Sequence, residues 1–199
     1  GEKNGTHILD LRKSLPLIER ALKFAHESSK NKKKFLFVST KKQHSEIIEN
    51  IAKETNNYFV NFRWLGGMIT NWNTVKNSIN TLNNYENILN SDNTVFTKKE
   101  LSDIEKKKIR LDKTLGGIVE MKTTPDVIFI IDTNREHIAV LEAKKLGIPI
   151  IGIVDTNCDP DIIDYPIPAN DDGVKSVQFI LDSFEKVLVS NKDISPEES

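Results

Sequence analysis

Residues 58–72 read YFVNFRWLGGMITNW, and the rest of the chain can be arranged around them. The first three residues open this stretch like a buried strand, but residues 63–67 fit no regular element. Two consecutive glycines permit a positive φ and a close approach of the backbone. The only tryptophans of the chain, Trp64 and Trp72, lie here beside an arginine. Two interpretations stay open: a binding platform at the end of a strand, or an aromatic loop that fills the core.

Composition narrows the class of protein before any motif is considered. The chain has 199 residues and a formal net charge of −1, and this length suits one domain with an inserted subdomain. Because the overall charge is near zero, contacts to nucleic acid must come from local basic clusters. A single cysteine, Cys158, excludes an internal disulfide and fits a reducing compartment. No apolar run approaches the roughly 18 residues of a membrane span, and no signal-peptide pattern opens the chain.

Apolar runs and the residues that interrupt them predict an α/β domain. Continuous apolar runs are typical of strands in a sheet that is covered on both faces. We predict strands at 35–38, 58–61, 127–131 and 148–154, with a short edge strand at 165–167 beside two prolines. Helices are predicted at 10–29, around 47–51, at 135–146 and over 174–184. This order favours a Rossmann-like (flavodoxin-like), mostly parallel sheet covered by helices on both faces.

Residues 73–117 predict an antiparallel helical hairpin, a coiled coil inserted after the second strand. Thr97 and Glu100 form a capping-box pattern, and two glycines follow the last apolar position. Apolar residues recur at helical spacing in both halves: Val75, Ile79, Leu82 and Leu89, then Leu101, Ile104, Leu111 and Leu115. We therefore divide the chain into 1–72 (first part of the α/β domain), 73–117 (protruding hairpin), 118–190 (second part of the α/β domain) and 191–199 (polar tail).

Local signals predict how several helices begin and which side chains they bury. Thr40 is expected to cap the helix after the first strand. Residues 133–136 are expected to form a second capping box, and residues 170–172 to cap the last helix. Pro16 fits best if the regular part of the first helix begins near Ser14. The predicted inward positions include Leu15, Ile138, Leu141, Leu146 and Val174.

An enzyme is the alternative that the sheet suggests. In open α/β sheets the ligand crevice lies at the carboxyl ends of the strands. That edge would carry Ser39, Thr40, Arg63, Asp132, Asp155, Asp159 and Asp161, and its carboxylates could hold Mg²⁺ for phosphate chemistry. However, the first strand ends without an acidic nucleophile, no glycine-rich phosphate loop is present, and the four histidines are scattered. We therefore favour a binding role over catalysis and assign no catalytic residue, cofactor or metal ligand.

Residues 63–72 closely resemble the RWLGG-x-LTN signature of bacterial-type ribosomal protein S2, a component of the small ribosomal subunit. Further matches follow in order along nearly the whole chain, with Ser39 standing where glycine is usual. They are residues 3–8, 37–41, 125–132, 136–137, 142–143, 147–149, 154–157, 159–160 and 167–172. The amino-acid sequence around Cys158 and at 168–170 is most similar to that of plastid members of the family. The excess of lysine, asparagine and isoleucine is typical of an A/T-rich genome such as that of an organelle.

The resemblance implies a Rossmann-like domain with a protruding helical hairpin, and a structural role without catalysis. It implies a monomer within the ribosome, between head and body of the small subunit, in contact with rRNA and neighbouring proteins and with no membrane. The expected location is the ribosome of an organelle, with the plastid favoured. The alternatives are a mitochondrion and the bacterial cytoplasm. The segment that the family usually carries before Gly1 is not in this sequence, so its contacts are not assigned.

Candidate contact residues follow from charge and position. For RNA phosphates they are Arg12, Lys13, Lys41, Lys42, Arg63 and Lys76. Trp64 or Trp72 could stack on a base, although closing the junction between sheet and hairpin is at least as good an explanation for both. For protein contacts the candidates are Asp132, Asp155, Asp159, Lys106, Lys107 and Arg110. Phosphate would be repelled by the acidic strand ends, so we expect that edge to face proteins or bound Mg²⁺.

Overall fold

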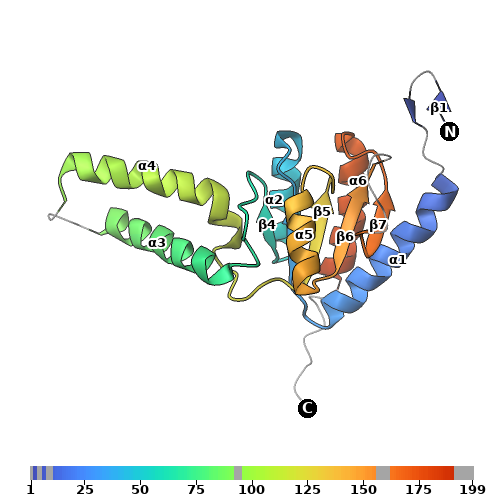
Figure 1. Ribbon diagram of the computed structural model, residues 1–199, viewed down its shortest axis with the longest axis horizontal. Coiled ribbons are helices and arrows are strands. Elements are labelled where there is room, and N and C mark those ends of the chain that lie inside the picture. Colours follow the sequence, from blue (N-terminus) through green and yellow to red (C-terminus); the bar gives the residue numbers. More distant parts are fainter. Residues whose placement is uncertain (1, 4–5, 8–10, 92–95, 156–161, 191–199) are drawn as a thin grey trace, which may run out of the picture.

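The computed structural model describes residues 2–3, 6–7, 11–91, 96–155 and 162–190, with side chains from residue 14 onward. Five parallel strands form one sheet in the order β4-β3-β5-β6-β7 (Figure 1). The predicted α/β fold with a parallel sheet is confirmed, and β7 is an edge strand as predicted. The strands are β3 (Phe35–Val38), β4 (Tyr58–Val60), β5 (Val127–Ile131), β6 (Ile150–Val154) and β7 (Tyr165–Pro168). A separate antiparallel pair joins β1 (Glu2–Lys3) to β2 (Thr6–His7).

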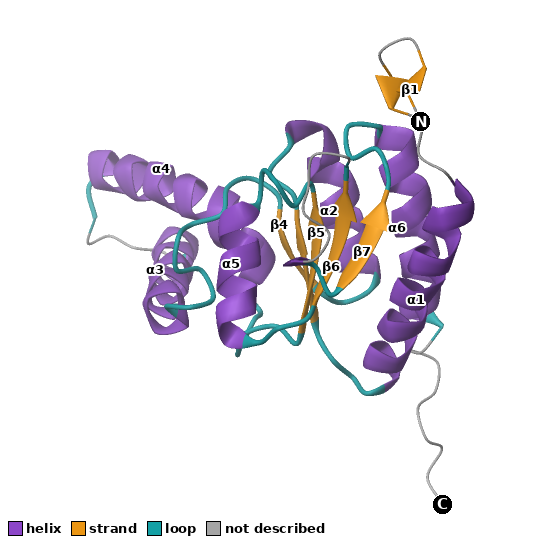
Figure 2. Cartoon of the chain, turned by 45° about the vertical axis from the view of Figure 1, so that its right-hand side comes forward, coloured by secondary structure: helices purple, strands orange, loops and turns teal. Residues whose placement is uncertain are grey.

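Helices cover both faces of the sheet (Figure 2), and successive strand side chains point into two different cores. Phe35 and Phe37 face one core, whereas Leu36 and Val38 face the other. Because both faces are buried, β3 reads as a continuous apolar run instead of an alternating one. The first core is closed by α1 (Leu11–Lys30), α2 (Ser45–Glu54) and α6 (Val174–Val189), and the second by α5 (His137–Leu146), the loop after β4 and the base of the hairpin.

The predicted hairpin is present and extends away from the sheet (Figure 1). Its helices are α3 (Trp72–Asn90) and α4 (Lys98–Leu115). The Thr97–Glu100 capping box is confirmed: Thr97 N donates to Glu100 Oε2 at 2.8 Å, and Glu100 N donates to Thr97 Oγ1 at 3.4 Å. Lys108 Nζ lies 3.0 Å from Glu86 Oε1 and links the two helices. The division of the chain into four segments stays a prediction.

A glycine fixes the place where the hairpin returns to the sheet. After α4 the chain forms a short 3-10 turn, η2 (Gly116–Ile118), which lies against the outer side of β4. A Cβ at Gly117 would stand 2.1 Å from the carbonyl oxygen of Phe59 and 2.7 Å from its ring. The φ of Gly117 is not positive, so the backbone conformation does not explain the glycine. Glycine is required here because the backbone of β4 approaches too closely for a side chain. The φ of Gly67 is +85° and that of Gly147 is +67°, so both adopt a left-handed backbone, as the sequence allowed for the glycine pair at 66–67.

The first helix agrees with the predicted span of 10–29 to within one residue, but its expected regular start and one of its expected inward positions are wrong. α1 starts at Leu11, and Pro16 lies inside it, so the prediction of a regular start near Ser14 is wrong. Leu15, which we expected to point inward, is 56% exposed. Ala21 and Ala25 are fully buried, because small side chains let the helix lie close to β7 and α6, and Ile18 and Leu22 pack against the same core.

The predicted cap at Thr40 and the capping box at 133–136 are wrong, because a tertiary contact takes their polar groups. Thr40 N and Thr40 Oγ1 donate to Glu136 Oε1 at 2.8 and 2.6 Å. Glu136 is therefore used across the sheet edge and not in a local box. After β3 the chain passes through a 3-10 turn, η1 (Lys42–His44), and α2 begins only at Ser45.

The cap predicted at 170–172 is wrong for a similar reason. The N-cap position of α6 is Gly173, which has no capping side chain. Asn170 Oδ1 accepts from Asp172 N at 2.9 Å, so it closes the turn before the helix. The carboxylates of Asp171 and Asp172 instead reach Lys41.

Four apolar positions predicted to face inward lie on the surface. Ile138, Leu141, Leu146 and Val174 are between 43% and 64% exposed. The face of α5 that packs on the sheet is narrow, with Ala139, Val140 and Ala143 buried beside Glu142. Glu142 takes one of the buried positions of α5, where its carboxylate accepts hydrogen bonds from the loop after β4.

Candidate nucleic-acid interface

The loop after β4 is wrapped around one carboxylate. Trp64 Nε1 and Gly67 N donate to Glu142 Oε1 at 3.1 and 2.7 Å. Ile69 N, Thr70 N and Thr70 Oγ1 donate to Glu142 Oε2 at distances of 3.0 to 3.1 Å. The left-handed backbone at Gly67 turns these donors toward one point. The unusual composition of residues 64–70 is therefore explained first by this anchor on α5.

These hydrogen-bond donors stabilise the ionised form of the Glu142 carboxylate, although the side chain is buried. Burial alone would raise the pKa of the Glu142 carboxyl, but hydrogen bonds from the loop outweigh it and lower that pKa below its ordinary value. The sequence reasoning did not single out this residue. The available signal was an acidic residue on a helix face otherwise made of alanine and valine.

A second polar cluster lies at the carboxyl end of the sheet, where the strand order reverses between β3 and β5. Lys41 Nζ is 2.7 Å from Asp132 Oδ2, 3.0 Å from Asp171 Oδ1 and 2.7 Å from Asp172 Oδ1. Burial would lower the pKa of the Lys41 ammonium, but its hydrogen bonds to the three carboxylates raise that pKa above its ordinary value. His44 is fully buried beside it, and its ring lies 3.2 Å from Ser39 Oγ. Burial and the Lys41 charge lower the pKa of His44.

The carboxylates of this cluster are paired with Lys41 and are not free for the Mg²⁺ of the enzyme alternative. The crevice of an open α/β sheet would lie here, yet the Lys41 ammonium occupies the space between the carboxylates. Within the described ranges, no group of three His, Cys, Asp or Glu side chains could hold a metal ion. Asp155 follows β6 and is half-buried, and Asp159 and Asp161 lie outside the described residues.

No helix of the described part is long and apolar enough to cross a membrane.

The predicted RNA-contact residues fall into three groups. Lys42, Arg63 and Lys76 are exposed. Lys41 is engaged with three carboxylates, and the side chains of Arg12 and Lys13 lie outside the described residues. Lys76 lies on α3 of the hairpin, whereas Lys42 and Arg63 follow the neighbouring strands β3 and β4.

The two tryptophans take the positions expected of junction residues. Trp64 is 7% exposed and belongs to the second core, with its indole N–H on Glu142. Trp72 is half-buried against the same core, and its Nε1 donates to Lys122 O at 3.3 Å. Stacking of either ring on RNA stays a prediction, and the burial of Trp64 counts against it.

The predicted protein-contact residues lie far apart on the fold. Lys106, Lys107 and Arg110 are exposed on α4 of the hairpin, where Lys106 Nζ is 3.8 Å from Asp103 Oδ1. Asp132 is at the strand ends and is paired with Lys41. These residues therefore cannot form one contact surface, although each part can face a different partner.

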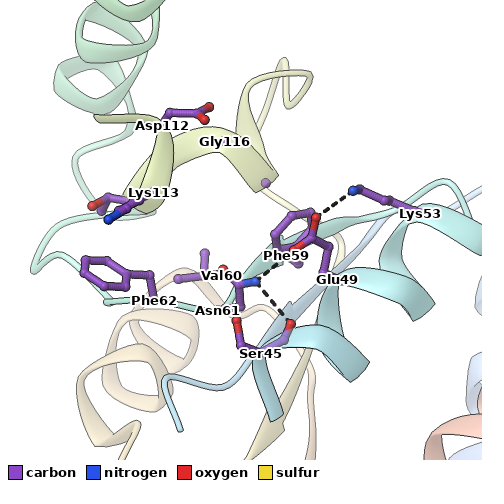
Figure 3. A pocket seen from close by; sticks show the side chains of 12 residues that line it. Ser45, Glu49, Lys53, Phe59, Val60, Asn61, Phe62, Asp112, Lys113 and Gly116 are labelled. Atoms are coloured by element: carbon purple, nitrogen blue, oxygen red, sulfur yellow. Dashed lines mark hydrogen bonds and ion pairs between the residues drawn. The ribbon is translucent and has the colours of Figure 1, made fainter. Parts of the chain in front are cut away.

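Two pockets flank the end of β4. The first, about 470 Å³, lies between α2, β4 and the base of the hairpin (Figure 3). There Asn61 Nδ2 donates to Ser45 O at 3.1 Å, and Glu49 pairs with Lys53 at 2.6 Å. The second, about 440 Å³, lies between the loops that follow β4 and β5, and Arg63 and Arg135 both line it. The sequence reasoning did not select Arg135, because a lone arginine in a predicted cap carries no signal by itself.

Comparison with known proteins gives a consistent result along the chain. The model of the family described as "Ribosomal protein S2" matches residues 1–190. A "Small ribosomal subunit protein uS2" from Wolbachia pipientis subsp. Culex pipiens is 56% identical over 177 residues, which are 89% of this chain and 65% of that relative. A protein of the same name from Rhizobium rhizogenes is 49% identical over 189 residues, 95% of this chain and 74% of the relative. The chain thus spans somewhat less than two thirds of the length of the Wolbachia relative.

Proposed function

Because the chain belongs to the ribosomal protein S2 family, we propose that it is a structural constituent of the small ribosomal subunit. The observation that carries this proposal is the family match over residues 1–190, together with relatives named as small-subunit proteins at 56% and 49% identity. We propose that the chain binds small-subunit rRNA and neighbouring ribosomal proteins as a monomer, between head and body of the subunit.

The fold supports assembly and gives the enzyme alternative no support. An enzyme would need its strand-end carboxylates available, but Asp132, Asp171 and Asp172 neutralise Lys41. The protein is therefore described as a binding component and not as an enzyme. The hairpin offers a second surface, whose exposed Lys106, Lys107 and Arg110 we assign to neighbouring proteins.

The RNA contacts are proposed to be few and local. The net charge of −1 cannot supply the counterion release on which RNA affinity rests, so a small number of exposed cations must do so. Lys42, Arg63 and Lys76 remain the candidates with exposed side chains. Arg12 and Lys13 remain proposals from the sequence.

The location of the protein is the ribosome, and its host is a finer question. The plastid assignment rests on composition and on the residues around Cys158 and 168–170, and it stays a prediction. The relatives named above come from bacteria, which favours the bacterial alternative. Fractionation of the host cell, with the tagged chain followed by immunoblot, distinguishes a plastid or mitochondrion from the bacterial cytoplasm.

The test of the proposed function is cosedimentation. The tagged chain is followed through a sucrose gradient of a gentle host lysate, at low and then at high salt. Migration with small subunits and release only at high salt are expected, because phosphate contacts weaken as salt rises. An unrelated tagged protein of the same size serves as control. Recovery at the top of the gradient at both salt concentrations would reject the proposal.

A further inference from the structure

The pocket between the loops after β4 and β5 combines positive charge with an exposed aromatic ring. Arg63 comes from the first loop and Arg135 from the second. The lining of the pocket also includes Phe62, Thr40 and Glu136. The pocket lies at the carboxyl end of the sheet, the edge from which we expected phosphate to be repelled, but its own charged lining is two arginines and one glutamate. Its volume of about 440 Å³ is in the range of small-ligand sites.

The guanidinium of Arg135 is oriented by one hydrogen bond, and its two terminal nitrogens remain without a partner among the described residues. Its Nε donates to Thr40 Oγ1 at 3.0 Å, which fixes the direction of the guanidinium. Glu136 Oε1 is 4.0 Å from the same nitrogen, but this oxygen already accepts two hydrogen bonds from Thr40. The Arg135 side chain is 54% exposed. Among the described residues no acceptor lies on its terminal nitrogens, so they are available to a ligand.

Arg63 is presented in a similar way. It is exposed, and it has no ion-pair partner in the described part of the chain. The next residue, Trp64, is anchored on Glu142, so the backbone at Arg63 is held in place. Two guanidinium groups from separate, well-anchored loops therefore border one pocket. Guanidinium forks match the geometry of phosphate oxygens better than any other side chain.

Phe62 adds an exposed aromatic ring to the pocket. A site for inorganic phosphate alone would not need such a ring. Phe62 lines both pockets and is 55% exposed. Figure 3 shows its ring extending away from Asn61 and Glu49. A phenylalanine left this exposed beside two arginines is typical of sites where an unstacked base lies on an aromatic face.

The charge of the surroundings selects this pocket among its neighbours. The Lys41 cluster has three carboxylates against one ammonium. The other pocket beside β4 has Glu49 and Asp112 against Lys53 and Lys113. The Arg63–Arg135 pocket has two guanidinium groups against the one carboxylate of Glu136, so of the two pockets that flank β4 only this one carries an excess of positive charge.

We propose that this pocket binds one unpaired nucleotide of RNA, with its phosphodiester between Arg63 and Arg135 and its base against Phe62. The inference rests on the proposed function, which it makes more specific by naming a site and a single-stranded ligand. Arg135 and Phe62 are then the principal RNA contacts of the α/β part, together with Arg63.

The experiment measures binding of the purified 199-residue chain to a fluorescein-labelled single-stranded RNA of 12 nucleotides by anisotropy, between 50 and 300 mM salt. Arg63→Gln and Arg135→Gln should each weaken binding about tenfold and lower the salt slope by roughly 0.7, the value for one phosphate of a single strand. Phe62→Leu should weaken binding about tenfold without changing the slope, and Phe62→Trp should restore it. Lys145→Ala, at the opposite end of α5, is the matched control and should change affinity less than twofold.

Three outcomes would overturn the inference. The first is wild-type affinity in both arginine variants when circular dichroism shows them folded. The second is equal binding of a 12-base-pair RNA duplex with no effect of Phe62→Leu, which indicates general attraction to phosphate. The third is stronger competition by a hexaglutamate peptide than by unlabelled RNA, which indicates an acidic protein partner.

Failure of the inference and failure of the proposed function can be told apart. The Arg63→Gln/Arg135→Gln double variant is passed through the sucrose gradient described above. If the wild-type chain cosediments and the double variant is released at the same salt concentration, the function stands and the site is wrong. If the double variant is released at lower salt, both stand. If neither chain cosediments, the proposed function itself fails.

Discussion

Replacing Glu142 by glutamine removes one of the two oxygens around which residues 64–70 are wrapped. If the amide oxygen keeps the place of Oε2, the new NH₂ group faces Trp64 Nε1 and Gly67 N, which both lose their acceptor. Each buried donor without a partner costs about 1–3 kcal/mol. We therefore expect Glu142→Gln to lower the free energy of unfolding by roughly 3 kcal/mol, a large part of the 5–15 kcal/mol typical of a folded protein.

The two tryptophans give this prediction a direct readout. Trp64 and Trp72 are the only ones in the chain and border the loop, so urea unfolding can be followed by their fluorescence. With a slope of about 3 kcal/mol per molar urea, the midpoint should fall by about 1 M. Glu105→Gln, an exposed carboxylate on α4, is the control and should change stability by less than about 0.5 kcal/mol. Hydrogen exchange at the amides of Ile69 and Thr70 detects an opening of the loop without global unfolding.

The reasoning would be refuted by a small effect. If Glu142→Gln costs less than about 1 kcal/mol and leaves exchange at both amides unchanged, the carboxylate does not hold the loop. Glu142→Ala should cost more than Glu142→Gln, because all five hydrogen bonds are then lost. The reverse order would show that the loop tolerates an empty space better than an amide.

Three further predictions follow from single contacts. Gly117→Ala places a Cβ 2.1 Å from a carbonyl oxygen of β4 and should cost about 2 kcal/mol or more in urea unfolding, whereas Gly66→Ala, which has no atom within 4 Å, should be nearly neutral. Lys41→Met leaves three carboxylates without their cation and should cost roughly 2–4 kcal/mol, against at most about 0.5 kcal/mol for Lys53→Met in an exposed helical pair. Because the pKa of folded Glu142 is lowered, its contribution is present above the unfolded value of 4.5 and is lost as pH falls through the folded value. Thermal melts from pH 7 to pH 3 should therefore show the difference between wild type and Glu142→Gln narrowing, and a constant difference would contradict this.

Patterns of local origin determined the fold class of this chain. The strands at 35–38 and 127–131 were recognisable because a sheet buried on both faces needs continuous apolar runs. The hairpin followed from helical spacing, and its Thr97–Glu100 capping box closes within four residues. Gly147 closes α5 because only glycine adopts a left-handed backbone at no steric cost. In each case the residues that interact are close in the sequence.

Tertiary structure alone decided where the polar side chains go. Thr40 and Glu136 both fit helix caps by their local sequence, yet they bond to each other across 96 positions. Lys41 could have met RNA, but the sheet brings Asp132 and Asp171 to it from separate loops. A polar group takes the partner that the packed backbone brings within about 3 Å, and no pattern of neighbouring residues encodes that distance. For the same reason Arg63 is joined in one pocket by Arg135, which the sequence places 72 residues away.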